Sequence, residues 1–99
     1  MNTPWMEMTL REYQTALASS SPTPGGGTAA AIALGQASAL TCMVCDLTIG
    51  REKWKEGWAF AEETVRETIP LLTKSGILAD DDSQAFDDVM AAYKLPRET

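Results

Sequence analysis

The sequence predicts an all-α fold, a bundle of about four helices with a long central alanine-rich helix. Apolar residues recur at the three- and four-residue spacings of helices along most of the chain. No stretch alternates apolar and polar residues as a half-buried strand does. The 99 residues, 44% of them hydrophobic, suffice for one small domain with a modest core, residues 1–99.

The first helix is expected to begin after Thr9. Thr9 and Glu12 have the spacing of a capping box, in which a hydroxyl caps the helix and a glutamate lies three residues later. The helix should end before Ser19, because two prolines and three glycines within residues 22–27 cannot continue it. Three apolar residues at helical spacing are expected to be buried: Leu10, Tyr13 and Leu17.

Residues 28–47 predict the long central helix, which carries no charge before Asp46 and should close near Gly50. A helix that is apolar on all sides belongs inside an assembly. Three partner helices, one of them short, leave it incompletely covered, so we expect oligomerisation to complete the bundle. Cys42 and Cys45 lie late in this helix, where no helix N-terminus stabilises a thiolate, and we expect buried, inert thiols.

Two further helices are expected in the second half of the chain. The third should begin near residues 51–53, bend or restart at Pro70, and stop at residues 74–76. Its apolar stripe is Trp54, Trp58, Ala61, Val65, Ile69 and Leu72. The fourth should open at residues 80–84, where acidic side chains suit the N-terminal dipole, and end at residues 95–96. Its inner stripe is Phe86, Val89, Met90 and Tyr93.

Charge and composition exclude several classes of protein. Eight basic and 14 acidic residues give a net charge of −6, which disfavours nucleic acid and anionic membrane surfaces as partners. Two cysteines and no histidine argue against a disulfide framework and a zinc site, so no metal is expected. We find no signal peptide and no apolar run of about 20 residues, so a cytoplasmic location without membrane contact is expected.

The segment that leads into the central helix is the first candidate site. The exposed N–H groups and partial positive charge of a helix N-terminus suit an anion, and glycines let a ligand approach the backbone. A plain turn between helices is an equally weighted interpretation. The candidate ligand-binding residues are Pro22, Thr23, Pro24, Gly25, Gly26, Gly27 and Thr28.

Two charged clusters have alternative interpretations. Arg51 and Lys53 belong to the one cationic segment of an acidic chain, which is suited to a carboxylate-bearing ligand or is simply a solvated helix turn. Residues 80–82 either cap a helix or supply a general acid or base, since neighbouring like charges discourage ionisation. Trp54 and Trp58 are expected to pack in the core, with an aromatic wall for a flat ligand as the alternative.

Three blocks in this order resemble the cyclodeaminase/cyclohydrolase family. The family includes the cyclodeaminase domain of formiminotransferase-cyclodeaminase and bacterial methenyltetrahydrofolate cyclohydrolases. The blocks are residues 17–31, with PTPGGG before alanines, residues 47–54, and residues 80–96. The resemblance implies an all-helical dimer or higher oligomer acting on a one-carbon-substituted tetrahydrofolate, with no cofactor besides this substrate. Family members either expel ammonia to close a methenyl ring or add water to open it.

The resemblance also implies roles for single residues. Residues 22–28 would line the folate pocket, Arg51 and Lys53 would lie near the anionic tail of the folate, and Lys94 is a weaker ligand contact. Asp82, and after it Asp80, would handle the proton. Family domains are roughly twice as long, within the usual size of one domain. Two alternatives therefore stand beside the enzyme: a non-catalytic helical association module, and a protein that binds a folate-like anion without turnover.

Overall fold

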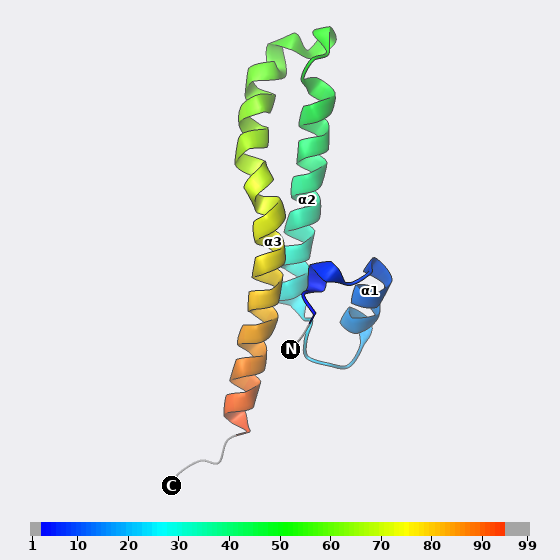
Figure 1. Ribbon diagram of the computed structural model, residues 1–99, viewed down its shortest axis with the longest axis vertical. Coiled ribbons are helices and arrows are strands. Elements are labelled where there is room, and N and C mark those ends of the chain that lie inside the picture. Colours follow the sequence, from blue (N-terminus) through cyan, green and yellow to red (C-terminus); the bar gives the residue numbers. More distant parts are fainter. Residues whose placement is uncertain (1–2, 95–99) are drawn as a thin grey trace.

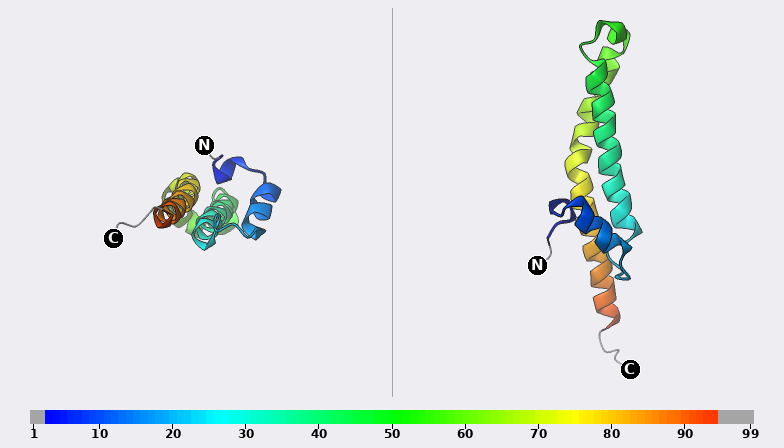
Figure 2. Two further views of the ribbon diagram at one scale, coloured as in Figure 1. Left: turned by 90° about the horizontal axis from the view of Figure 1, so that it is seen from below. Right: turned by 90° about the vertical axis from the view of Figure 1, so that its right-hand side faces the viewer.

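The computed structural model describes residues 3–94 and shows a long antiparallel helical hairpin with a short N-terminal helix against one side (Figure 1). The elements are η1 (Trp5–Glu7), α1 (Leu10–Ala18), α2 (Gly26–Thr48), η2 (Glu52–Gly57) and α3 (Trp58–Tyr93), where η denotes a 3₁₀-helix. Figure 2 shows α2 and α3 side by side, with η1 and α1 at the end of the hairpin away from η2. The described residues contain no strand, which confirms the all-α class.

The N-terminal helix α1 begins and ends where the sequence predicts. Thr9 Oγ1 accepts a hydrogen bond of 3.0 Å from the Glu12 backbone N–H, and the Thr9 N–H donates to the Glu12 carboxylate over 2.8 Å. The helix ends at Ala18. Only Tyr13 of the three expected residues is buried, whereas Leu10 and Leu17 are exposed. That part of the prediction is wrong because α1 has a neighbour on one side only.

The capping box makes α1 sensitive to acid. The hydrogen bonds from Thr9 hold the pKa of Glu12 below its usual value. Because the pKa is lower in the folded than in the unfolded chain, the box stabilises α1 above the unfolded-state pKa. This contribution is lost as the pH falls through the folded-state pKa.

We expect the Glu12 carboxyl resonance to titrate at lower pH in the native protein than in the Thr9→Ala variant. A carbon-detected NMR titration of both proteins measures the two midpoints. Because the variant keeps the backbone N–H of residue 9, equal midpoints would show that the Thr9 side chain does not lower the pKa of Glu12.

The long helix α2 begins two residues earlier than expected, so that Gly26 and Gly27 form its first turn. It closes after Thr48, and Gly50 adopts a φ of 86° there, as the sequence predicts. Contrary to our expectation, α2 is long and apolar enough to cross a membrane by length and composition. Only 17% of this apolar window is buried within the described chain, so α2 is not a core helix of a single chain.

Small residues form the contact between α2 and α3. The buried residues of the two helices are Thr28, Ser38 and Cys45 in α2, and Ala61, Thr68, Ser75, Gly76, Ala79 and Ser83 in α3. Ser75 lies against the Cα of Gly35, where any side chain would meet its hydroxyl group. The helix backbones therefore approach one another closely, as small residues permit.

The third and fourth predicted helices are one helix, α3, so the described residues hold three α-helices rather than four. It begins at Trp58, after the 3₁₀-helix η2, and not near residues 51–53 as predicted. Helix α3 continues through Pro70 and through the expected stop at residues 74–76. Ser75 and Gly76 are buried, and a Cβ on Gly76 would lie 2.8 Å from Met6 Cγ, so this glycine serves close packing. Residues 80–82 consequently lie inside a helix, and the prediction that they cap one is wrong. The expected end at residues 95–96 lies outside the described residues.

Much of the apolar surface of the hairpin is uncovered. The stripe predicted for the fourth helix is exposed, as are Trp54 and Ile69 from the third. The molecule measures 70 × 30 × 20 Å, and its radius of gyration of 18.7 Å exceeds the ~13 Å of a compact 100-residue domain. Its accessible surface of 7562 Å² exceeds by about 2,000 Å² that of a compact monomer of the same mass.

Candidate functional site

The glycine-rich loop and the acidic segment meet at the start of α2. A Cβ on Gly27 would lie 2.5 Å from the Asp82 Cγ, so the Asp82 carboxylate occupies space that only glycine leaves free. The first turn of α2 presents free N–H groups and a partial positive charge, which favour an anion there. Asp82 is solvent-exposed, so its carboxylate also faces any small molecule that enters this end of the hairpin.

A buried polar cluster lies beside this carboxylate. The side chain of Thr28 is completely buried, and its Oγ1 lies 3.2 Å from Asp82 Oδ2, 3.2 Å from the Ala79 carbonyl oxygen and 2.6 Å from Ser83 Oγ. The indole Nε1–H of Trp5 donates to Ser83 Oγ over 2.9 Å. Three elements, η1, α2 and α3, therefore share one hydrogen-bonded network at Asp82.

Asp80 has different surroundings from Asp82. It is half-buried, and its Oδ1 accepts a 3.0 Å hydrogen bond from the backbone N–H of Trp5. About two turns further along α3, Asp87 accepts a 3.2 Å hydrogen bond from Thr23 Oγ1. Asp80 and Asp87 thus tie the N-terminal segment and the loop to α3 and line a hollow of about 570 Å³.

The remaining loop residues have mixed exposure. Pro24 is buried and follows a cis peptide bond, and Gly25 is the N-cap residue of α2. Pro22 and Gly26 are exposed. The loop therefore presents some of its predicted ligand-binding residues to solvent and uses others to build the start of α2.

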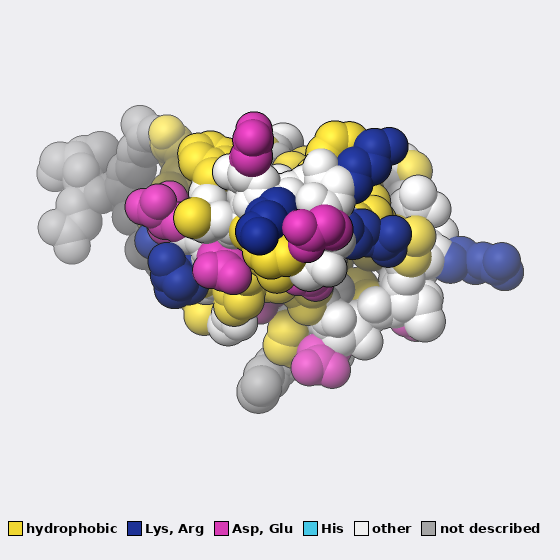
Figure 3. Space-filling view, turned by 90° about the horizontal axis from the view of Figure 1, so that it is seen from above, with side chains coloured by type: hydrophobic (Ala, Val, Ile, Leu, Met, Phe, Trp, Pro, Cys, Tyr) yellow, Lys and Arg dark blue, Asp and Glu magenta, His cyan; other side chains and the backbone are white. Residues whose placement is uncertain are grey.

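The predicted cationic residues lie away from Asp82. Arg51 and Lys53 follow the far end of α2, whose 23 residues span about 35 Å. Figure 3 looks onto this end, where basic and acidic side chains lie side by side. Lys94 caps the C-terminus of α3, about 18 Å along the helix from Asp82. Within one chain the structure brings none of the three to Asp82.

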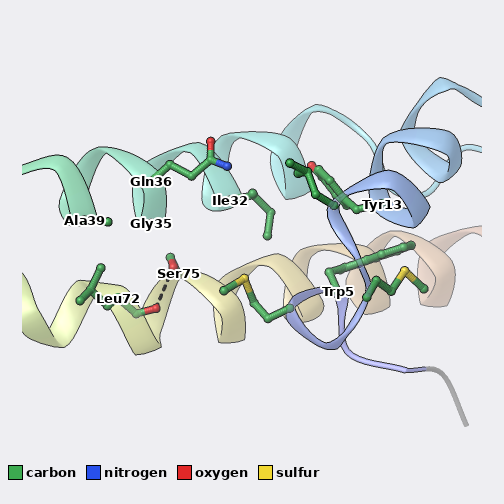
Figure 4. A pocket seen from close by; sticks show the side chains of 11 residues that line it. Trp5, Tyr13, Ile32, Gly35, Gln36, Ala39, Leu72 and Ser75 are labelled. Atoms are coloured by element: carbon green, nitrogen blue, oxygen red, sulfur yellow. Dashed lines mark hydrogen bonds between the residues drawn. The ribbon is translucent and has the colours of Figure 1, made fainter.

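An apolar groove of about 370 Å³ lies beside the cluster (Figure 4). Side chains from η1, α1, α2 and α3 line it, among them Trp5, Tyr13, Ile32 and Leu72. The rings of Trp5 and Tyr13 meet edge to face with centroids 6.2 Å apart, and burial raises the pKa of Tyr13. Asp82 does not line this groove; it lines a separate hollow of about 520 Å³ with Gly27, Ala31 and Leu34. Among the described residues, Trp5 is connected to Asp82 only through Ser83 and Thr28. Trp54 lies at the η2 end and is half exposed.

Trp5 and Ser83 are the functional candidates that the sequence analysis missed. The spacing of three and four residues between Asp80, Ser83 and Asp87 places them on one face of a continuous helix. An interpretation of residues 80–87 as a helix interior would have found Ser83. No local pattern marks Trp5, which reaches the cluster through a contact 78 positions along the chain.

Comparisons with known proteins match most of the chain to one protein family. Residues 9–99 match the sequence pattern of the family described as formiminotransferase-cyclodeaminase. A methenyltetrahydrofolate cyclohydrolase of Methylorubrum extorquens is 47% identical over 92% of this chain and 44% of its own length. The formimidoyltransferase-cyclodeaminase of Gallus gallus is 33% identical over 91% of this chain and 17% of its own length. The chain thus spans less than half the length of these curated relatives.

Proposed function

The chain belongs to the formiminotransferase-cyclodeaminase family, and from this premise we propose that it acts in folate one-carbon metabolism. The proposed reaction is the addition of water to methenyltetrahydrofolate, with loss of ammonia from formiminotetrahydrofolate as the alternative chemistry of the same site. The 47% identity to a methenyltetrahydrofolate cyclohydrolase supports the hydrolytic direction. The observation that carries the proposal is the Asp82 carboxylate against Gly27, because it joins two separate blocks of the sequence resemblance into one site.

Asp82 is the proposed proton-handling group. In the hydrolysis, a water oxygen bonds to the methenyl carbon between two folate nitrogens, and the carboxylate takes the proton of this water. The C–N bond to one nitrogen of the resulting tetrahedral carbon then breaks as that nitrogen receives the proton from the carboxyl group. The hydroxyl oxygen forms the C=O bond of the formyl group and gives its own proton to water. An exposed carboxylate beside a helix N-terminus is suited to this exchange, since it remains in contact with substrate and water.

The surrounding residues have supporting roles in the proposal. Asp80 is a second candidate for proton transfer, and its bond to the Trp5 N–H also fastens the N-terminal segment over α3. The hollow that Asp82 lines with Gly27, Ala31 and Leu34 offers a mostly apolar surface to the flat ring system of a folate. No cofactor besides the folate substrate is part of the proposal.

We further propose that the chain self-associates as a dimer or higher oligomer in the cytoplasm. The excess surface of about 2,000 Å² is more than the ~800 Å² that each partner contributes to a standard interface. Because Arg51 and Lys53 lie far from Asp82 in one chain, a neighbouring copy would supply them to the anionic tail of the folate. The acidic composition supports the absence of nucleic-acid and anionic-membrane partners.

A second candidate is a helical association module without turnover. The uncovered apolar face of α2 and α3 and the separation of the cations from Asp82 favour it. Loss of methenyltetrahydrofolate absorbance faster than its spontaneous hydrolysis would establish the enzyme. Calorimetric titration with methenyl- and formiminotetrahydrofolate distinguishes the remaining cases. Binding without turnover indicates an anion-binding protein, and an oligomer that binds neither compound indicates the association module.

A further inference from the structure

We propose that Thr28 is a positioning residue for Asp82 and that its hydroxyl group turns as Asp82 gains and loses a proton. A directed chain of hydrogen bonds runs from the Trp5 indole through Ser83 to Thr28 and ends at Asp82. The inference deepens the proposed function and rests on it for the kinetic test alone.

The direction of this series of hydrogen bonds follows from which groups can donate. The indole N–H of Trp5 can only donate, so Ser83 Oγ accepts its hydrogen bond. The hydrogen of Ser83 is then available to Thr28 Oγ1, 2.6 Å away. The reverse order would leave the Ser83 hydrogen without an acceptor among the hydrogen bonds of the described residues. The Thr28 hydrogen is therefore the last in the chain.

This last hydrogen has two acceptors at equal distance. The Ala79 carbonyl oxygen and Asp82 Oδ2 each lie 3.2 Å from Thr28 Oγ1. Thr28 is fully buried and Ser83 is 7% exposed, so water does not compete for these groups. A buried hydroxyl left unpaired is costly, which means that the Thr28 hydrogen must point to one acceptor or the other.

The charge of Asp82 decides between the two acceptors. Hydrogen bonds to an ionised carboxylate are about twice as strong as those between neutral groups, so Thr28 donates to Asp82 while this group is charged. When Asp82 takes up a proton, the hydroxyl turns to the Ala79 carbonyl without movement of any heavier atom. Among the described charged residues, Asp81 shares the hollow at Gly27 with Asp82, and α2 places no charged side chain there.

An NMR titration tests this coupling without reference to activity. We expect the Trp5 indole N–H resonance of the intact 99-residue chain to shift as Asp82 is protonated. The shift should be lost in Asp82→Asn and in Thr28→Val, and kept in Thr28→Ser. The indoles of Trp54 and Trp58, at the η2 end, serve as internal references.

Two outcomes of the titration would overturn the proposal. One is an unchanged pH response of the Trp5 indole in Asp82→Asn, a substitution of an exposed side chain that tests the coupling even where Thr28→Val does not fold. The other is an unchanged response in folded Thr28→Val. Because Asp80 accepts the backbone N–H of Trp5, the same titration in Asp80→Asn removes the direct influence of that carboxylate.

Kinetics supply the second arm of the test. Loss of a hydrogen bond to a charged group predicts a fall in kcat of about 10-fold or more in Thr28→Val, with KM unchanged and recovery in Thr28→Ser. A raised KM with native kcat would instead make Thr28 a binding residue and contradict the proposal. A native chain that shows the NMR coupling but no turnover would refute the proposed function and leave the positioning role in place.

Discussion

Replacement of Asp82 by asparagine is expected to lower kcat for methenyltetrahydrofolate hydrolysis by a factor of about 10²–10⁴, the usual contribution of general acid–base catalysis. The amide has nearly the same shape as the carboxylate, so it fits against Gly27, and the Thr28 hydroxyl keeps the Ala79 carbonyl oxygen as an acceptor. It cannot accept the proton of the attacking water. The decrease in absorbance of the methenyl compound measures the rate, and circular dichroism with analytical ultracentrifugation verifies that fold and oligomeric state are retained.

Asp88→Asn is the matched control for this experiment. Asp88 is an exposed aspartate of α3, and its carboxylate accepts a 2.8 Å hydrogen bond from the Gln84 side chain. The same chemical change at Asp88 should leave the rate at its native value. Full activity in Asp82→Asn would remove Asp82 from the mechanism, and an equal loss in both variants would indicate a general effect of charge on α3.

Local sequence patterns correctly predict a helix end where that end depends only on neighbouring residues in the sequence. The Thr9 and Glu12 capping box needs no partner from elsewhere in the chain, and both of its hydrogen bonds are present. The stop predicted at residues 74–76 failed for the opposite reason. Ser75 and Gly76 are small because α2 and the N-terminal segment pack against them, and a local pattern does not distinguish this from a helix terminus.

The helix stop wrongly predicted at residues 74–76 also concealed the layout of the candidate site. Once α3 is one helix, α2 and α3 form a simple hairpin, and residues equally distant from its turn must face one another. Thr28 then meets Ser83, and Gly35 meets Ser75, as the structure shows. Arg51 and Lys53 fall at the turn itself, the point furthest from Asp82. The sequence resemblance grouped Thr28, Arg51, Lys53 and Asp82 by function, but their positions in space depend on the continuity of α3.

Gly35→Ala is expected to destabilise the hairpin by about 1–3 kcal/mol, the usual cost of overpacking. The new Cβ would meet the Ser75 hydroxyl group and lie 3.1 Å from the Ser75 Cβ. Ser75 is 1% exposed and its hydroxyl donates to the Leu72 carbonyl, so it cannot turn aside without loss of that bond or separation of the helices. This cost outweighs the gain of at most ~1 kcal/mol that alanine brings to a helix interior.

Gly26→Ala and a double variant make the Gly35 experiment specific. A Cβ on Gly26 meets nothing within 4 Å, so this control should be neutral or slightly stabilising. Ser75→Ala should recover part of the stability lost in Gly35→Ala, because it removes the hydroxyl that the new methyl group meets. Urea unfolding of the native chain, Gly35→Ala, Ser75→Ala and the double variant, all at one protein concentration, gives the coupling energy between positions 35 and 75. A Gly35→Ala variant as stable as Gly26→Ala would show that α2 and α3 do not approach as closely at Ser75 as the structure indicates.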